Sequence, residues 1–260
     1  MFTKLISCKL NYLIMHKLYL CLSLLISITT SCNTDSDYNS DNLLKAFNLL
    51  SPEERIWAHK VNSLDLIKER VSDFKGIEVD IFYNQEKDNF EIKHEIETSG
   101  IDLECFLDSI LQVKDLYFWF DYKNLNTNTD SGISKLYSIL SERELEKKSF
   151  IESYFAKKLD GFKGKLATSF WLSIIDIPEE KSERDKLYQK KYKYIEDYNI
   201  TMLSANFRMY EFITEYFPNY KCNYWIFNEL TDHKAANLKK LIASPNVNVI
   251  IIDGNKNPLK

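Results

Sequence analysis

The sequence predicts an α/β protein: a single (β/α)8 barrel of the TIM type that follows an N-terminal lipoprotein signal peptide. Two observations predict the barrel. From residue 55 onward, eight short apolar strands alternate with seven helical stretches, and 260 residues, 45% of them hydrophobic, are enough for one large core. A third observation, an apolar run that leads into a cysteine, predicts the signal peptide.

The N-terminal segment has the parts of a bacterial export signal. Residues 18–28 form an apolar run of eleven, which is too short to cross a ~30 Å hydrocarbon core and suits the hydrophobic region of a signal peptide. Met15-His16-Lys17 supplies a basic start, so translation from Met15 is an alternative to Met1. Thr29-Thr30-Ser31 then leads into Cys32 and resembles a lipobox, in which the cysteine is diacylated, although Leu is usual where Thr29 stands.

The chain therefore divides into three parts. Residues 1–31 are expected to be the signal peptide, residues 32–50 the lipidated Cys32 with a flexible polar tether, and residues 51–260 the barrel domain. An ordinary secretory peptide or an uncleaved anchor is the alternative for the first part. A lipid anchor would hold the barrel outside the cytoplasm, at a bacterial inner or outer membrane.

Short apolar runs define the strands, and amphipathic stretches define the helices between them. The expected strands are residues 55–59, 76–82, 116–123, 149–153, 166–173, 200–206, 222–228 and 247–253, with an extra strand at 90–95. The expected helices are residues 63–73, 103–113, 131–147, 154–162, 181–198, 209–216 and 233–243. The last strand is almost wholly apolar, which is typical of a strand buried on both faces. An open doubly wound sheet is the alternative, but no Gly-rich phosphate loop follows the first strand.

Charge and cysteine content narrow the range of partners. The formal net charge is −4, and it becomes −7 without residues 1–31, which carry three lysines and no acid. A nucleic-acid partner is not expected, because phosphate binding needs clustered Lys and Arg. The charge balance does not exclude a small anionic substrate that binds in a local site. Cys105 and Cys222 fit no zinc or redox spacing and are expected to be buried thiols, with a disulfide as the alternative.

Polar residues at strand ends are the candidate functional residues, because barrel enzymes carry their sites at the C-terminal ends of the strands. They are His59 in the first strand, Glu78 and Asp80 in the second, His94 in the extra strand, and Asp121 and Lys123 in the third. Side chains at i and i+2 of a strand share a face, so Glu78 and Asp80 can both point into the barrel. The aromatic run at 117–120 is expected to pack between barrel and helices.

The carboxylates Glu78, Asp80 and Asp121 are expected to bind a divalent cation. Buried side by side, they raise one another's pKa unless a counter-charge is present, and oxygen ligands favour Mg²⁺ or Ca²⁺ over zinc. The two histidines suit general acid and base roles, since imidazole titrates near neutral pH. Together with the lysine, these groups suit phosphodiester cleavage. A buried structural ion pair between Asp121 and Lys123 is the alternative.

The order of these residues resembles that of a known superfamily. The pattern His59 … Glu78-x-Asp80 … His94 … Asp121-x-Lys123 resembles the glycerophosphodiester phosphodiesterases, whose barrels share a fold with the phospholipases C. Residues 57–63 (WAHKVNS) and 119–124 (WFDYKN) are similar to the menorin branch of that superfamily. The resemblance is clear over residues 55–125 and weaker beyond. It implies metal-dependent hydrolysis of a small phosphodiester or lipid-derived substrate.

Several positions depart from the superfamily's pattern. Lys60 and Val61 stand where Arg and Gly follow the first histidine, Glu95 stands where Asp follows the second, and Asp121 replaces a Glu. Lys60 and Asn62, beside the first histidine, are candidates for substrate contact together with Lys123. The departures leave a second hypothesis open, in which the barrel hydrolyses nothing and serves as a surface-anchored binding or structural module.

Overall fold

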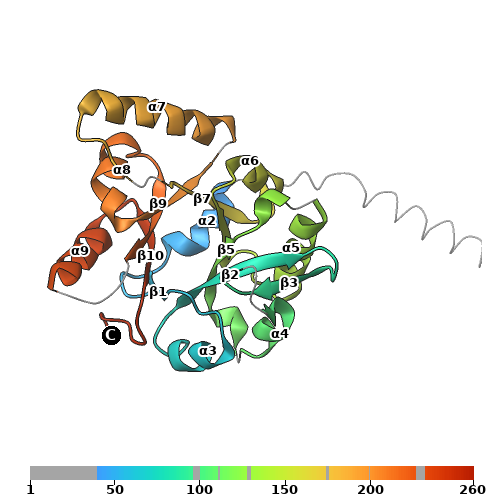
Figure 1. The fold of residues 1–260 in the computed structure, drawn as a ribbon. Coiled ribbons are helices and arrows are strands. Elements are labelled where there is room, and N and C mark those ends of the chain that lie inside the picture. Colours follow the sequence, from blue (N-terminus) through green and yellow to red (C-terminus); the bar gives the residue numbers. More distant parts are fainter. Residues whose placement is uncertain are drawn as a thin grey trace, which may run out of the picture. The chain divides into compact units, whose positions relative to one another are not determined.

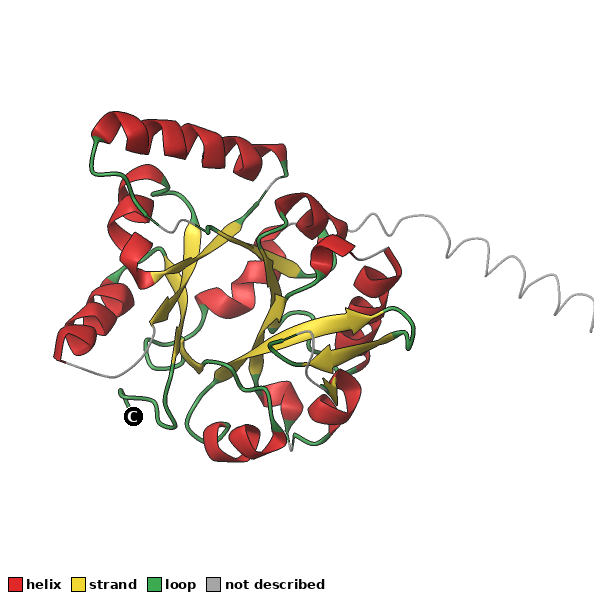
Figure 2. Ribbon diagram, in the orientation of Figure 1, coloured by secondary structure: helices red, strands yellow, loops and turns green. Residues whose placement is uncertain are grey.

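Eight parallel strands close into a barrel, which confirms the predicted (β/α)8 fold (Figures 1 and 2). They are β1 (Ile56–Ala58), β2 (Gly76–Asn84), β5 (Tyr117–Tyr122), β6 (Ser149–Ser153), β7 (Ala167–Trp171), β8 (Met202–Asn206), β9 (Lys221–Ile226) and β10 (Val247–Ile252). β1 pairs in parallel with β10 on one side and, through Ala58 and Ile77, with β2 on the other. The sheet is therefore closed, and the open doubly wound alternative is excluded.

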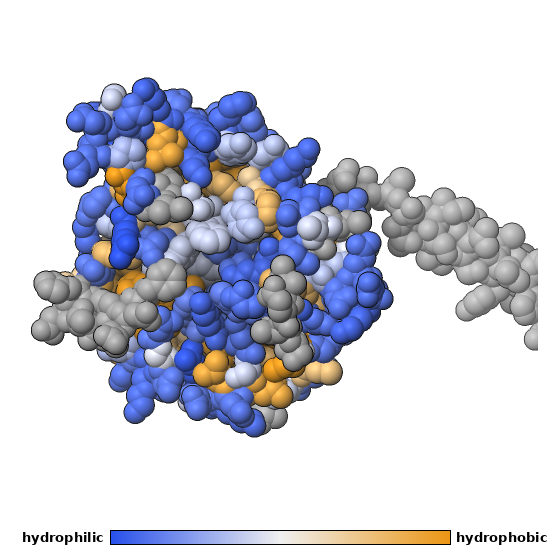
Figure 3. Space-filling view, in the orientation of Figure 1, coloured by the Kyte–Doolittle hydropathy of each residue, from blue (hydrophilic) through white to orange (hydrophobic). Residues whose placement is uncertain are grey.

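The computed structural model describes residues 40–95, 100–110, 112–127, 130–173, 176–198, 200–226 and 232–260. The expected signal peptide, Cys32 and the first residues of the expected tether lie outside the described residues. None of the helices in the described ranges is both long and apolar enough to cross a membrane. On the face shown in Figure 3, hydrophilic residues predominate and hydrophobic ones show only in separate patches.

Helices follow the strands where the sequence predicts them. They are α3 (Leu64–Arg70), α4 (Leu103–Asp108), α5 (Asp130–Glu142), α6 (Ala156–Leu159), α7 (Lys181–Asp197), α8 (Tyr210–Tyr216) and α9 (Asp232–Ala243). The first two begin at a side-chain cap, because Ser63 accepts from the N–H of Leu66 and Asp102 from that of Cys105. Cys105 is exposed, contrary to expectation, whereas Cys222 is buried, and both thiols are free.

A small antiparallel extension is attached to β2. This strand continues beyond the barrel, and residues Ile81–Asn84 pair with β3 (Asn89–Ile92), which in turn pairs with the two-residue β4 (Ile101–Asp102). The extra strand is thus shorter than predicted, and His94 follows it instead of lying within it. The extension brings the chain after β3 back to the C-terminal end of the barrel.

The aromatic run on β5 is divided between two environments. Phe118 and Phe120 belong to the large core between barrel and helices, as predicted. Tyr117 and Trp119 alternate with them and belong to the separate apolar cluster inside the barrel. The expectation that the whole run packs against the helices is therefore wrong for half of it, because neighbouring strand residues point to opposite faces.

A helix that was not predicted closes one end of the barrel. Residues Ser40–Asn48 form α2, and its Phe47 ring meets those of Trp57, Tyr117 and Phe150 at centroid distances of 6.2, 5.7 and 5.7 Å. Two of these rings stand at the starts of β5 and β6, so α2 covers the N-terminal end, behind the strands in Figure 1. The expected flexible tether is wrong over this stretch, because apolar side chains on one face of the helix pack on the barrel interior.

Phe47→Ala is expected to lower the free energy of unfolding by about 3–5 kcal/mol, because it removes a buried ring and leaves a cavity. The ring is 1% exposed, whereas Leu49, at the end of the same segment, is 84% exposed. Leu49→Ala is the matched control and should change the free energy by less than about 0.5 kcal/mol. Urea denaturation of both variants measures the difference, and equal effects would show that α2 does not pack into the barrel.

Candidate active site

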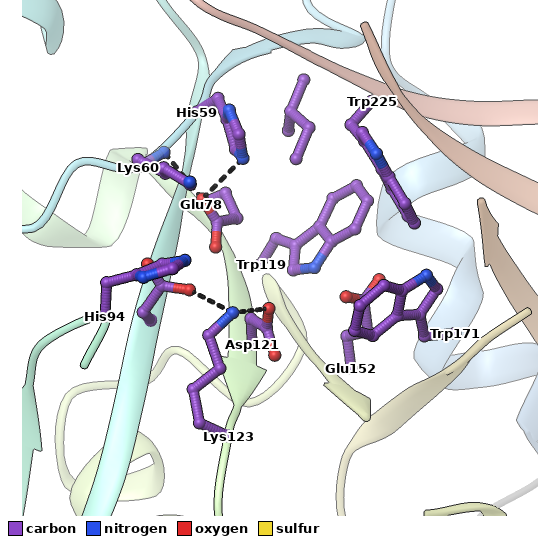
Figure 4. A pocket seen from close by; sticks show the side chains of 12 residues that line it. His59, Lys60, Glu78, His94, Trp119, Asp121, Lys123, Glu152, Trp171 and Trp225 are labelled. Atoms are coloured by element: carbon purple, nitrogen blue, oxygen red, sulfur yellow. Dashed lines mark hydrogen bonds and ion pairs between the residues drawn. The ribbon is translucent and has the colours of Figure 1, made fainter. Parts of the chain in front are cut away.

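A cavity of about 130 Å³ is lined by residues at the C-terminal ends of the strands (Figure 4). Its lining consists of His59, Lys60, Glu78, Asp80, His94, Trp119, Asp121, Lys123, Glu152, Trp171, Trp225 and Ile251. The structure thus brings seven of the predicted site residues together in one place. Of the remaining predicted residues, Asn62 lies behind Asp80, and Cys32 is outside the described residues.

Three carboxylate side chains line one side of this cavity. Glu78 and Asp80 alternate on β2, and Asp80 pairs in register with Asp121 on the neighbouring β5. One ligand oxygen from each of the three residues lies within 4.8 Å of the others. We call Glu78, Asp80 and Asp121 the carboxylate cluster. It follows directly from the i, i+2 spacing and the parallel pairing of the two strands.

Burial and mutual repulsion dominate the electrostatics of the cluster. Burial, reinforced by Asp80 and Asp121, raises the pKa of Glu78 well above its usual range, and burial also raises the pKa of Asp121. The Lys123 ammonium lies 2.6 Å from Asp80 Oδ1 and also pairs with Asp121. Burial opposes the charge on this lysine, but the two aspartates outweigh it and raise the pKa of Lys123. The positive charge of one lysine cannot neutralise three carboxylates. The residues present therefore fit a divalent cation, which would supply the missing positive charge.

Hydrogen bonds fix the orientation of the carboxylates. Asn62 Nδ2 donates to Asp80 Oδ2 at 2.6 Å, and the Asp80 N–H donates to Asn62 Oδ1 at 3.0 Å. The Lys60 N–H donates to Glu78 Oε2 at 2.7 Å from a residue in the left-handed region, with φ of 53°. Asn62 thus holds a predicted metal ligand in place, and its amide is engaged with Asp80 at both ends.

His59 is held between two acids. Its Nδ1 lies 2.7 Å from Asp253 Oδ1, just after β10, and its Nε2 lies 3.8 Å from Glu78 Oε2. Arg70, at the end of α3, donates to the His59 carbonyl at 2.7 Å. With the Nδ1 proton directed at Asp253, the Nε2 lone pair faces the carboxylate cluster. This is the arrangement of a histidine base oriented by a carboxylate.

His94 lies near the opening of the cavity. The N–H of Lys93 donates to the Asp80 carbonyl at 3.2 Å, which keeps this segment beside β2. The side chain of His94 is 44% exposed, and its Nδ1 lies 2.5 Å from Glu95 Oε1. The two histidines therefore differ in setting, because His59 is buried beside the cluster whereas His94 is open to solvent.

Sequence reasoning missed several residues of the cavity. Glu152 pairs in register with Asp121, is buried, and has a pKa raised well above its usual range by burial and by Asp121. Its place at the end of an expected strand was a usable signal. Asp253, directly after the last strand, could have been found in the same way. By contrast, nothing in the sequence separates Trp171 and Trp225 from ordinary core residues.

Comparisons with known proteins bear on the fold. No family model matches the sequence, and no curated protein matches it. Among solved structures, a protein from Silicibacter pomeroyi assigned to the glycerophosphoryl diester phosphodiesterases has a TM-score of 0.58 at 10% identity, covering 84% of this chain and 95% of its own. Glycerophosphodiester phosphodiesterases from Parabacteroides distasonis and Thermotoga maritima give TM-scores of 0.54 and 0.52 at 12% identity, each covering 78% of this chain, and 94% and 95% of their own. The chain therefore shares the TIM-barrel fold of solved glycerophosphodiester phosphodiesterases.

Proposed function

We propose that the protein is a metal-dependent phosphodiesterase of the glycerophosphodiester phosphodiesterase type, acting on small glycerophosphodiester-like or lipid-derived substrates. One observation carries the proposal: the carboxylate cluster, Lys123 and two histidines face one cavity at the end of the barrel where such enzymes carry their sites. The order of these residues and the shared fold support it. Residues 57–63 and 119–124 further support a place near the menorin branch.

The carboxylate cluster would hold a divalent cation, Mg²⁺ or Ca²⁺, since all three side chains offer oxygen ligands. When bound, the ion supplies positive charge that polarises the phosphoryl oxygens. Lys123 adds a second, fixed positive charge at the same side of the cavity. Because Asp80 and Asp121 hold its ammonium in place, it can stabilise negative charge on a phosphoryl oxygen without further reorganisation.

The two histidines divide the proton transfers between them. His59 Nε2 accepts the proton of the attacking nucleophile, and Asp253 stabilises the imidazolium that forms. His94, at the opening, donates a proton to the oxygen of the leaving alcohol as its bond to phosphorus breaks. The exposed position of His94 suits this role, because the leaving group must depart to solvent.

The test is hydrolysis of a panel of glycerophosphodiesters by purified residues 33–260, with Mg²⁺, with Ca²⁺ or with a chelator. The released alcohol and phosphomonoester are measured. We expect turnover only in the presence of a metal ion. A folded protein that binds the metal but releases neither product would favour the binding-module hypothesis.

We propose in addition that a lipid on Cys32 anchors the barrel to a bacterial membrane, outside the cytoplasm. The apolar run at 18–28 and the small residues before Cys32 support this anchor. Cys32→Ser is expected to move the protein from the membrane fraction to the soluble fraction and to abolish labelling by radioactive palmitate. Cys105→Ser, at an exposed thiol of the barrel, is the control and should stay in the membrane fraction. A Cys32→Ser protein that keeps the label would contradict the anchor.

A further inference from the structure

The N-terminal end of the barrel, opposite the cavity, is where the folded chain begins. The helix α2 starts at Ser40 and packs on this end through Phe47. Seven residues separate Cys32 from Ser40 in the sequence, and eight peptide steps span at most about 29 Å. The lipid anchor proposed above would therefore hold this end of the barrel next to the bilayer.

The loops at this end are basic, whereas the rest of the mature chain is acidic. Each loop leads from a helix into a barrel strand, and we call them the entry loops: residues 49–55, 71–75, 109–116, 143–148, 163–166, 198–201, 217–220 and 244–246. They carry eight Lys and Arg and six Asp and Glu, a net charge of +2. The remainder of residues 32–260 carries 23 and 32 of these residues, a net charge of −9. An anionic surface is thus repelled by most of the molecule and attracted by its N-terminal end.

The positive charge gathers before two neighbouring strands. Lys147 precedes β6, and Lys163 and Lys165 precede β7, which pairs in parallel with β6. Lys147 and Lys163 are exposed, and Lys165 is partly exposed. In the entry loop before β5, Lys114 forms an ion pair with Glu144, but the ion pairs found between described residues include none for the other three lysines. Their ammonium groups are therefore positioned for an external anion.

A hydrophobic side chain projects from the same end. Leu49, directly after α2, is 84% exposed, the largest fraction among the large hydrophobic side chains of the described ranges. Lys45 and Asn48 on the outer side of α2 are exposed as well. A single exposed leucine carries no meaning by itself. A leucine beside lysines, at the end that the anchor holds near the bilayer, can enter the acyl boundary while the ammonium groups contact lipid phosphates.

We propose that the N-terminal end of the barrel docks on an anionic lipid surface, with Leu49 inserted at the acyl boundary and Lys147, Lys163 and Lys165 at the phosphates. This docking face rests on the lipid anchor of the proposed function, which brings the end of the barrel within reach of the bilayer. The occupant is a lipid surface because charge, an exposed apolar side chain and a short connection to the lipidated cysteine meet at one end.

Docking in this way points the opening of the cavity away from the bilayer, because the cavity lies at the opposite ends of the strands. Lys75 lies in the entry loop before β2, and Asp80 of the carboxylate cluster follows it by five residues. At about 3.3 Å per residue, the cluster stands roughly 17 Å along the strand from the docked end. Substrate then enters the cavity from the solvent side.

Fluorescence quenching tests the orientation on the lipidated protein made from the full chain. An environment-sensitive fluorophore is attached through Leu49→Cys or, at the opposite end, through Tyr154→Cys, each in a Cys105→Ser background. Tyr154 directly follows β6 and is 48% exposed. In vesicles of phosphatidylcholine and phosphatidylglycerol with nitroxide-labelled lipid, we expect at least about twofold quenching at position 49 and none at position 154. Quenching at position 154, or its absence at position 49, would overturn the proposal.

Charge variants test the chemistry of the lipid surface. Quenching at position 49 should fall in vesicles without phosphatidylglycerol and at high salt, because both weaken the attraction of lysines to the surface. Combining Lys147→Glu, Lys163→Glu and Lys165→Glu should lower the ratio of docked to undocked protein at least about tenfold. Circular dichroism checks that the variant folds. Quenching that ignores lipid charge, salt and this variant would overturn the proposal.

The matched control makes the same change of charge on a helix outside the entry loops. It combines substitutions of three exposed lysines of α7, namely Lys186→Glu, Lys190→Glu and Lys193→Glu. This variant should dock like the wild type. Equal losses in the two triple variants would show that net charge alone decides the binding, and the docking face would be rejected.

The docking face and the lipid anchor can fail separately. Palmitate-labelled protein that stays in the vesicles without quenching at position 49 would overturn the docking face and keep the anchor. Protein without lipid that still binds phosphatidylglycerol vesicles, with quenching at position 49, would overturn the anchor and keep the docking face.

Discussion

Replacing His59 with alanine is expected to lower kcat for phosphodiester hydrolysis by about 10²–10⁴-fold, the usual contribution of a positioned general base. His59 faces the carboxylate cluster but contributes no oxygen to it, so metal affinity should stay within about twofold of the wild type. Steady-state kinetics and calorimetric metal titration measure the two quantities. A His59→Ala protein with unchanged kcat would exclude this residue as the base.

The nature of the leaving group distinguishes the two histidines. His94→Ala should lower kcat by a similar factor for glycerophosphodiesters, whose alcohols need a proton as they leave. It should have little effect on bis(p-nitrophenyl) phosphate, because the phenolate leaves without one. His59→Ala should lower the rate for both substrates, since both need an activated nucleophile. Equal losses for both substrates in His94→Ala would contradict the assignment of His94 as the acid.

The barrel could be predicted because its strands are short apolar runs separated by helical stretches of ordinary length. For β6 the predicted and observed bounds agree at residues 149–153, and the other strands differ by a few residues at their ends. The helix α2 was missed because residues 33–42 are polar and turn-rich, and the apolar positions that follow form barely two turns. Such a short helix is stable through its packing on the barrel, and local sequence does not reveal that packing.

Part of the candidate site can likewise be predicted from local sequence, and the rest depends on contacts between residues that lie far apart in the chain. The carboxylate cluster depends on i, i+2 spacing within β2 and on pairing with the next barrel strand, and both can be read from the sequence. The contact between His59 and Asp253 joins residues 194 positions apart and depends on the closure of the barrel between β1 and β10. The three tryptophans that line the cavity come from β5, β7 and β9, and they resemble core residues until the barrel places them there.

Without metal, the protein is expected to lose stability as the pH rises from about 5 to 8. Burial holds the pKa of Glu78 and of Asp121 above their usual values, so the folded chain binds these protons more tightly than the unfolded chain. In the unfolded chain such groups titrate near pH 4. Their contribution to stability is therefore complete below about pH 4 and is lost as the pH rises through the higher folded pKa values.

A divalent cation should reverse this trend, because it replaces the protons in the carboxylate cluster. At a free concentration of one hundred times Kd it adds about 2.7 kcal/mol, and the gain should grow with pH as fewer protons compete. Thermal unfolding from pH 5 to 8, with saturating Mg²⁺ or Ca²⁺ and with a chelator, measures both effects. A metal effect of equal size at every pH would contradict a cluster that exchanges protons for a cation.

Two variants test whether the carboxylate cluster causes both the pH dependence of stability and the stabilisation by metal. Glu78→Gln should remove most of the metal stabilisation and reduce the loss of stability with pH in the chelator. Glu91→Gln is the control, because Glu91 lies outside the cluster and Lys87 and Lys93 lower its pKa to about 2. The stability that Glu91 contributes is lost only as the pH falls below about 4 toward 2, so between pH 5 and 8 this substitution should lower stability uniformly. The metal effect should be unchanged in Glu91→Gln, and a metal effect that survives in Glu78→Gln would place the cation elsewhere.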